Sequence, residues 1–397
     1  MTSSHADQAA DQTNLPAQSF RIDRSGLDRL FAVLKDHDYT LVGPTVRDCA
    51  IVYDELTGTQ DLPVGKGDRQ EAGTYQLVDR EDAALFGYNL GPHSWKKYLF
   101  PPRQKLWQAK LTDTGLTFSE ADQATSPKYA FIGVRACELH AIQIQDKVFS
   151  DDDHRDPHYC RIRERAFIVA VNCSQAAATC FCTSMNTGPA VSAGFDIALT
   201  EVIVFDAHYF IAQAGSPSGE AMLGLITQCP AEFTDVQAAA QCVANASAQM
   251  KRQLDTTDIQ NLLYRNADNS RWEEIAQRCL SCANCTMVCP TCFCSSVEDT
   301  TDLTGSHAER WRRWDSCFTL DFSYLHGGSV RSSTEARYRQ WMTHKLASWI
   351  DQFGASGCVG CGRCITWCPV GIDITEEVRL MRENDSAGNS NTQRSDL

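Results

Sequence analysis

Residues 279–290 read Cys279-Leu-Ser-Cys282-Ala-Asn-Cys285-Thr-Met-Val-Cys289-Pro290, and residues 358–369 read Cys358-Val-Gly-Cys361-Gly-Arg-Cys364-Ile-Thr-Trp-Cys368-Pro369. Both stretches have the spacing CxxCxxCxxxCP. Thiols at regular spacing form disulfides, bind a metal centre or pack as small buried side chains. The cellular compartment and the spacing itself decide between these three chemistries.

The compartment is indicated by the first twenty residues. The chain has 19 cysteines in 397 residues, and its start has neither the basic residues nor the apolar segment of a secretory signal. We therefore expect a cytoplasmic location, where thiols stay reduced. Metal binding is favoured over disulfides.

The repeated spacing is typical of bacterial iron–sulfur proteins, in which three thiolates wrap one face of a cubane while the fourth cysteine points to the other cluster. We therefore predict two [4Fe–4S] clusters with exchanged fourth ligands. Structural zinc needs four ligands, commonly as two CxxC pairs, and fits these eight cysteines poorly. One cluster is expected on Cys279, Cys282, Cys285 and Cys368, and the other on Cys358, Cys361, Cys364 and Cys289.

A third group of cysteines lies earlier in the chain. Cys180 and Cys182 form a CxC pair, and in an extended segment residues two apart point to one side. Cys137 and Cys173 each follow an expected strand, at residues 129–134 and 166–171. Because neighbouring strand ends can bring them together, our hypothesis is a third [4Fe–4S] cluster on Cys137, Cys173, Cys180 and Cys182. The alternative is that these are small buried core residues.

Seven cysteines remain. Residues 291–296 (TCFCSS) echo residues 179–184 (TCFCTS), which sets Cys292 and Cys294 apart, together with Cys317. Three roles are open for them: replacing Cys289 as a ligand, forming a redox-active pair, or packing around the first cluster and tuning it through weak hydrogen bonds. Core or surface positions are the default for Cys49, Cys160, Cys229 and Cys242.

Composition and periodicity set the domain organisation. With 43% hydrophobic residues the chain can bury a core in two or three domains. We expect a disordered segment over 1–22, an α/β or α+β domain over 23–255 with its own candidate iron–sulfur site, a mainly α-helical dicluster domain of bacterial-ferredoxin type over 256–382, and a disordered tail over 383–397. A hairpin is expected around Asp113-Thr-Gly115, and a longer helix over about 335–350.

Several function classes are disfavoured. Lys plus Arg number 36 against 50 Asp plus Glu, and the resulting net charge of −14 repels nucleic acid and anionic lipid. No apolar run approaches the length of a membrane span. The chain has no GxGxxG between a strand and a helix, no GxxxxGK[ST] and no CxxCH. We therefore assign no catalytic residue, and we expect electrons to enter from a partner.

Longer stretches carry a family resemblance. They are Gly133-Val-Arg-Ala-Cys137-Glu-Leu-His-Ala-Ile142, Asn172-Cys-Ser, Thr179-Cys-Phe-Cys182-Thr-Ser-Met, Gly43-Pro44, Leu85-Phe-Gly-Tyr-Asn-Leu-Gly-Pro-His-Ser94 and residues 357–373. Over about residues 40–380 the chain resembles the ferredoxin-like β subunit of cytoplasmic sulfhydrogenase-type [NiFe] hydrogenases and the A subunit of anaerobic sulfite reductases.

The resemblance implies an electron-transfer subunit in a hetero-oligomer, without turnover by itself. Its partners would be an FAD/[2Fe–2S] subunit that reacts with NAD(P)H and a catalytic subunit. We favour the small and large subunits of a [NiFe] hydrogenase over a sirohaem sulfite reductase subunit. Two other hypotheses stay open: a self-contained oxidoreductase with a substrate site in the α/β domain, and a zinc-stabilised interaction protein.

Overall fold

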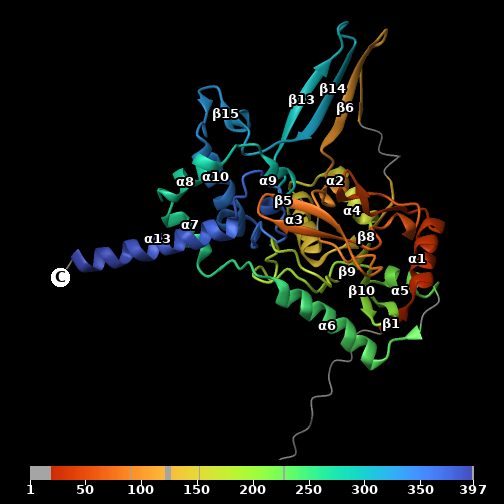
Figure 1. Ribbon diagram of the computed structural model, residues 1–397. Coiled ribbons are helices and arrows are strands. Elements are labelled where there is room, and N and C mark those ends of the chain that lie inside the picture. Colours follow the sequence, from red (N-terminus) through yellow and green to blue (C-terminus); the bar gives the residue numbers. More distant parts are fainter. Residues whose placement is uncertain (1–18, 90, 121–126, 152, 227–228, 396–397) are drawn as a thin grey trace, which may run out of the picture.

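The computed structural model describes residues 19–89, 91–120, 127–151, 153–226 and 229–395. An eight-stranded mixed sheet forms its N-terminal part (Figure 1). Four adjacent inner strands pair in parallel, and the remaining pairings in the sheet are antiparallel. From edge to edge the order is β12 (Cys229–Pro230), β1 (Ser19–Ile22), β11 (Ala207–Ala214), β10 (Ile197–Val204), β9 (Phe167–Val171), β8 (Tyr129–Val134), β2 (Thr40–Arg47) and β3 (Ala50–Glu55).

Helices cover both faces of this sheet, which explains the apolar runs of β8 (YAFIGV) and β9 (FIVAV). Alternate residues enter opposite cores: Ile132 and Val169 pack on one face, and Phe131 and Ile168 on the other. The expected α/β domain is thereby confirmed. The covering helices are α1 (Arg24–Asp36) and α5 (Pro217–Leu223) on the first face and α3 (Ala136–Phe149) and α4 (Pro157–Arg165) on the second, while α6 (Phe233–Gln249) lies over β10 and β11.

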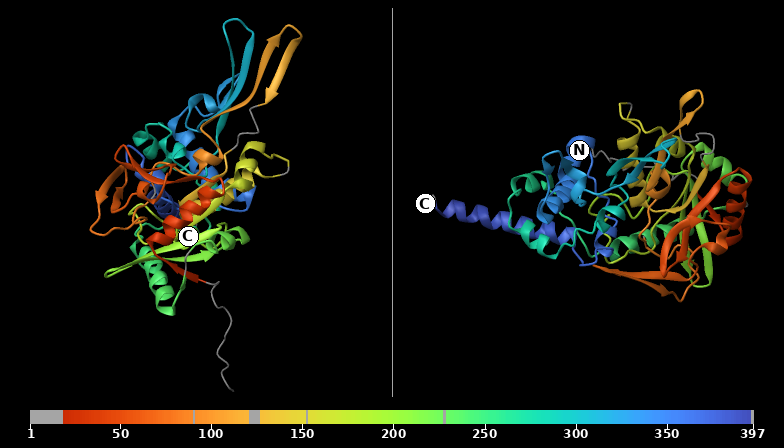
Figure 2. Two further views of the ribbon diagram at one scale, coloured as in Figure 1. Left: turned by 90° about the vertical axis from the view of Figure 1, so that its right-hand side faces the viewer. Right: turned by 90° about the horizontal axis from the view of Figure 1, so that it is seen from above.

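A second, four-stranded sheet projects from the body, and we call it the arm (Figures 1 and 2). Its first hairpin is the one expected around Asp113, because Thr112 pairs with Gly115. Its second hairpin comes from between the two cysteine motifs. The strand order is β13 (Ser295–Thr301), β14 (His307–Trp314), β6 (Arg103–Thr112) and β7 (Gly115–Glu120).

The arm corrects the expected architecture of the C-terminal domain. A mainly α-helical dicluster domain is not confirmed, because β13 and β14 belong to it and β14 pairs with β6 of the N-terminal part. The two strands read SSVEDTT and HAERWRRW, which lack the apolar alternation that marks a half-buried strand. The sequence offered no strand signal here, and the parts on either side of residue 255 are joined by a shared sheet.

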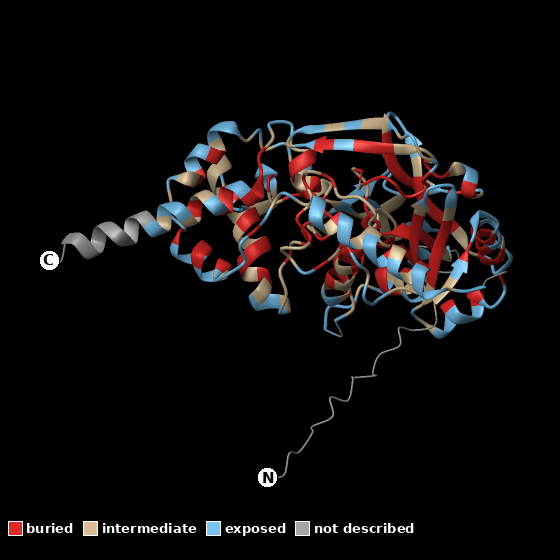
Figure 3. Cartoon of the chain, turned by 60° about the horizontal axis from the view of Figure 1, so that its bottom comes forward, coloured by how far each residue is buried: buried red, intermediate tan, exposed pale blue. Residues whose placement is uncertain are grey.

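Short helices form the rest of the C-terminal region around a second core that includes Trp272, Trp341 and Met342. Figure 3 shows buried residues concentrated in these helices and in the central strands. The helix expected over about 335–350 is present as a continuous run over 334–353. The helices are α7 (Ile259–Arg265), α8 (Arg271–Arg278), α9 (Asn284–Met287), α10 (Thr334–Thr343), a π-helical turn (His344–Ser348), α11 (Trp349–Phe353), α12 (Arg363–Thr366) and α13 (Ile374–Ser395).

Smaller elements complete the description: α2 (Lys96–Leu99), the hairpin β4 (Lys66–Glu71) and β5 (Thr74–Asp79), and the pair β15 (Tyr324–Leu325) and β16 (Gly328–Ser329). The termini differ from expectation in part. Residues 19–22 form β1, and α13 continues to Ser395, whereas residues 1–18 and 396–397 lie outside the described residues. None of the described helices combines the length and the hydropathy needed to cross a membrane.

Candidate iron–sulfur centres

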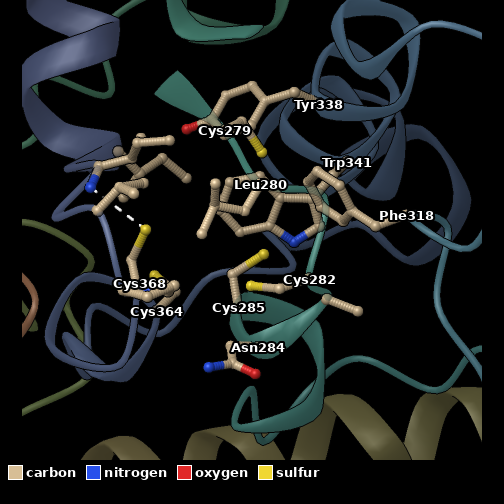
Figure 4. Close-up of a pocket in the computed structure, with 15 residues that line it drawn as sticks. Cys279, Leu280, Cys282, Asn284, Cys285, Phe318, Tyr338, Trp341, Cys364 and Cys368 are labelled. Carbon is tan, nitrogen blue, oxygen red and sulfur yellow. Dashed lines mark hydrogen bonds between the residues drawn. The ribbon is translucent and has the colours of Figure 1, made fainter. Parts of the chain in front are cut away.

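The first predicted set of cysteines surrounds one cavity. This set consists of Cys279, Cys282, Cys285 and Cys368, and all four line a cavity with about 450 Å³ of empty space, the solvent at its mouth included (Figure 4). The walls are mainly apolar and include Phe318, Trp341 and Ile372. Soft thiolate donors in an apolar pocket suit an iron–sulfur cluster. The cysteine from the second motif thus lies with three from the first.

The two motifs adopt the same local backbone. The amide of Ser281 lies 3.4 Å from the Cys279 sulfur, and the amide of Gly360 lies 3.4 Å from the Cys358 sulfur. Residues 281, 283, 360 and 362 all have positive φ angles, between 52° and 74°. Each loop therefore turns its backbone N–H groups toward sulfur, an arrangement that influences the potential of a bound cluster.

The second set consists of Cys358, Cys361, Cys364 and Cys289. Burial raises the pKa of Cys358 to about 12 and also raises those of Cys361 and Cys364, and negative charge on Cys289 adds to each increase. The pKa of Cys289 itself is well below its usual range, first because Cys292 hydrogen bonds to it and then because Lys345 lies nearby. Lys345 Nζ is 3.2 Å from the Cys289 sulfur. The structure therefore places these four thiols close enough for their charges to interact.

The third set, Cys137, Cys173, Cys180 and Cys182, also converges. Cys137 is the second residue of α3, which follows β8, and Cys173 follows β9. Because β8 and β9 are parallel neighbours, both cysteines lie at the same edge of the sheet. Burial raises the pKa of Cys137, and negative charge on Cys182 is the next largest cause of the increase. Burial likewise raises the pKa of Cys180 to about 12, and negative charge on Cys173 is the next largest cause of this increase. The structure therefore brings the four cysteines of the third set together at this edge of the sheet.

Buried arginines accompany the second and third sets. Arg135 is 2% exposed and lies beside Cys173, whereas Arg363 is fully buried beside Cys361. In the part of the chain that the structure describes, Arg135 Nε and Arg363 Nη1 are buried without a hydrogen-bond partner. Buried donors on cations call for an anionic acceptor. Clusters held by thiolates fit these two sites.

The second and third sets are joined directly. The Phe181 amide donates to the Gly360 carbonyl at 2.9 Å, and negative charge on Cys361 contributes to the raised pKa values of Cys137 and Cys182. An ion pair of 2.5 Å between Glu138 and Arg363 lies between the two sets. On the other side, Cys364 of the second set lines the cavity of the first. The three sets therefore adjoin one another in the order first, second, third.

Cys292, Cys294 and Cys317 lie beside the second set. Cys292 contacts Cys289, and a hydrogen bond from Cys317 lowers the pKa of Cys294 to about 7. The other cysteines, at 49, 160, 229 and 242, belong to none of these groups, and Cys160 is buried against the Phe149 carbonyl. In the described residues no three His, Cys, Asp or Glu side chains converge tightly enough to hold a single metal ion.

Two lysines at the centre carried no sequence signal. Lys96 and Lys345 are each 3% exposed, although lysine is ordinarily a surface residue. Lys96 donates to the Cys292 carbonyl at 3.0 Å and lies 3.9 Å from the centre of the Trp314 ring. Only the tertiary structure reveals that they flank cysteine sulfurs.

Two comparisons with known proteins give a match for this chain. Residues 278–372 match the family described as a 4Fe-4S dicluster domain. Over 290 residues the chain is 31% identical to sulfhydrogenase 2 subunit beta of Pyrococcus furiosus, an alignment that covers 72% of this chain and 82% of that protein. The chain belongs to the sulfhydrogenase β-subunit family. It is therefore an iron–sulfur protein with a [4Fe–4S] dicluster domain, as the two motifs predicted. No solved structure matches the chain.

Proposed function

We propose that this member of the sulfhydrogenase β-subunit family relays single electrons between an FAD/[2Fe–2S] subunit that reacts with NAD(P)H and the small and large subunits of a [NiFe] hydrogenase. When bound, [4Fe–4S] clusters take up and release one electron at a time. The observation that carries the proposal is the adjacency of the three cysteine sets. Neighbouring centres are what a relay needs.

In this proposal the chain holds three [4Fe–4S] clusters on the three sets. The first set would exchange electrons with a partner, because Cys282 is exposed and the neighbouring Leu280 is 63% exposed. The third set would be the opposite end of the relay; Cys137 and Cys182 are buried there, whereas Cys173 and Cys180 are half-buried. Arg135 and Arg363 would stabilise the anionic centres and donate hydrogen bonds to them.

The hydrogenase assignment is preferred over the sulfite reductase assignment. The relative that aligns over most of this chain is named a sulfhydrogenase subunit, whereas the dicluster family by itself fits both. A relay subunit needs no substrate pocket, and we propose that it has no turnover alone and works in the cytoplasm. A self-contained oxidoreductase is the competing function, and turnover by the isolated chain would support it.

Metal analysis tests the cluster assignment. The anaerobically purified chain should contain iron, matching acid-labile sulfide and no zinc. Cys279→Ala, Cys361→Ala and Cys180→Ala should each remove about four irons, because each breaks a different cubane. Cys160→Ala is the matched control, since Cys160 is buried outside the three sets. If Cys180→Ala retains all the iron, the third set is core packing. Zinc without sulfide would overturn the electron-transfer function.

Reconstitution tests the relay. The wild-type chain alone should not oxidise NAD(P)H, and a flavoprotein partner should restore reduction of its clusters, followed by visible and electron paramagnetic resonance spectra. Nickel in co-purifying subunits would support the hydrogenase assignment, whereas sirohaem would replace it with the sulfite reductase assignment.

A further inference from the structure

Three cysteines outside the predicted sets are brought together at the base of the arm. Cys292 and Cys294 directly precede β13, and Cys317 follows β14. Ser295 pairs with Trp314, and the Asp315 amide donates to the Cys294 carbonyl at 2.8 Å. This pairing places both ends of the hairpin side by side. As a result Cys317 hydrogen bonds to Cys294.

The loop before β13 repeats the form of the loop in the third set. Both read TCFC, and in both the threonine is fully buried and hydrogen bonds to the second motif or its flank: Thr179 reaches Thr366, and Thr291 reaches the Gly357 carbonyl at 2.7 Å. The intervening phenylalanine is anchored in each case. Phe181 is fully buried, and Phe293 packs edge to face on Trp349. Because residues two apart share a side, each anchored phenylalanine directs its two cysteines away from the core that it enters.

Charge is arranged in the same way at both loops. The third set has the buried cations Arg135 and Arg363, and the Cys292–Cys294 loop has Lys96 and Lys345. No carboxylate of the described residues forms an ion pair with either lysine. A buried ammonium without a counter-charge costs several kcal/mol, so an anionic group is required nearby. Lys345 lies 3.2 Å from the Cys289 sulfur of the second set. Lys96 donates to the Cys292 carbonyl and lies over the Trp314 ring. Burial lowers the pKa of Lys96, and negative charge on Cys292, Cys289 and Cys294 opposes this decrease, so Lys96 faces the cysteines of this loop as well as Cys289.

We propose that Cys292, Cys294 and Cys317 hold a fourth iron–sulfur cluster, a [4Fe–4S] centre with three protein thiolates. Lys96 provides charge compensation for it. The fourth iron has no cysteine from this group and is left for a ligand that is not a cysteine. This site goes beyond the proposed relay, which needs only the three sets. Cys289 contacts Cys292, so the fourth centre would adjoin the second.

Iron content of the full chain tests this site. The anaerobically prepared wild type should contain about sixteen irons per chain, whereas three cubanes supply about twelve. Cys294→Ala and Cys317→Ala should each lower the count by about four and remove the same spectroscopic component of the Mössbauer spectrum. Cys160→Ala, a buried cysteine outside every group, should leave the count unchanged.

Two results would overturn the proposal. One is an iron count in Cys317→Ala equal to that of the wild type. The other is a Cys294–Cys317 disulfide in the anaerobic protein, detected by thiol trapping and mass spectrometry, because paired sulfurs cannot ligate iron. If the control also loses iron, the wild-type Mössbauer spectrum decides, and only a fourth cubane component supports the site. Cys180→Ala distinguishes this outcome from failure of the relay, since it reports on the third set alone.

Discussion

The second cysteine motif packs so closely on the loop of the third set that adding one methyl group at Gly362 should destabilise the protein. Gly362 has a φ of 74°, and a Cβ added there would lie 2.4 Å from the Thr179 carbonyl oxygen. Its counterpart in the first motif is Ala283, with a φ of 66°. An alanine therefore tolerates this backbone conformation in the first motif. The glycine is required in the second motif by the neighbouring loop.

The expected cost of Gly362→Ala follows from two contributions. A left-handed conformation costs an L-residue about 1–2 kcal/mol. Overpacking against backbone that must move adds about 1–3 kcal/mol. We therefore expect Gly362→Ala to lower the free energy of unfolding by about 2–5 kcal/mol. The matched substitution Ala283→Gly should change it by less than about 1 kcal/mol, because relief of the same conformation offsets the loss of one partly buried methyl group.

Anaerobic thermal unfolding, followed by circular dichroism at matched iron content, measures both variants. Gly362→Ala should unfold at a clearly lower temperature and should release iron faster to a chelator than Ala283→Gly does. Equal behaviour of the two variants would refute the reasoning, because the 179–182 loop would then not constrain the second motif.

Three further predictions concern the charges and the clusters. Arg363→Met should destabilise the protein by about 3–5 kcal/mol by leaving Glu138 buried and unpaired, and Glu138→Gln in the same chain should restore most of this loss in thermal unfolding. Lys345→Met should lower the reduction potential of the second cluster by about 60–130 mV in a redox titration, which is the ~1.5–3 kcal/mol of a charge-assisted hydrogen bond converted for one electron. Removal of iron with a chelator should expose the core that holds Trp272 and raise binding of a hydrophobic dye, because five cysteines of the first and second sets pack against that core; an unchanged dye signal would contradict this.

Local patterns account for what could be predicted. The two CxxCxxCxxxCP stretches determine ligand chemistry, because a tight loop presents three thiols to one centre wherever it lies in the fold. Continuous apolar runs such as FIVAV identify inner parallel strands, since both of their faces are covered. The convergence of Cys137 and Cys173 could be anticipated for the same reason: their strands are parallel neighbours that end at one edge.

The second hairpin of the arm could not be predicted, because its strands β13 and β14 are polar. Arg310 and Asp299 face each other across β14 and β13 as an ion pair, and such strands have no apolar face to mark them. The sheet that is shared across residue 255 could not be predicted for a related reason. Pairing of β6 with β14 joins residues about two hundred positions apart, and no local pattern specifies such a partner.

The sequence by itself therefore determined the chemistry of this protein: thiol-rich loops for [4Fe–4S] clusters and an α/β domain beside them. The tertiary structure alone decided how the centres relate. It placed Cys364 in the wall of the first cavity, the third set against Gly360, and two lysines in the interior beside Cys289 and Cys292. The physical reason is that ligand spacing and hydrophobic period act within a few residues, whereas close packing and charge compensation arise only when distant segments meet.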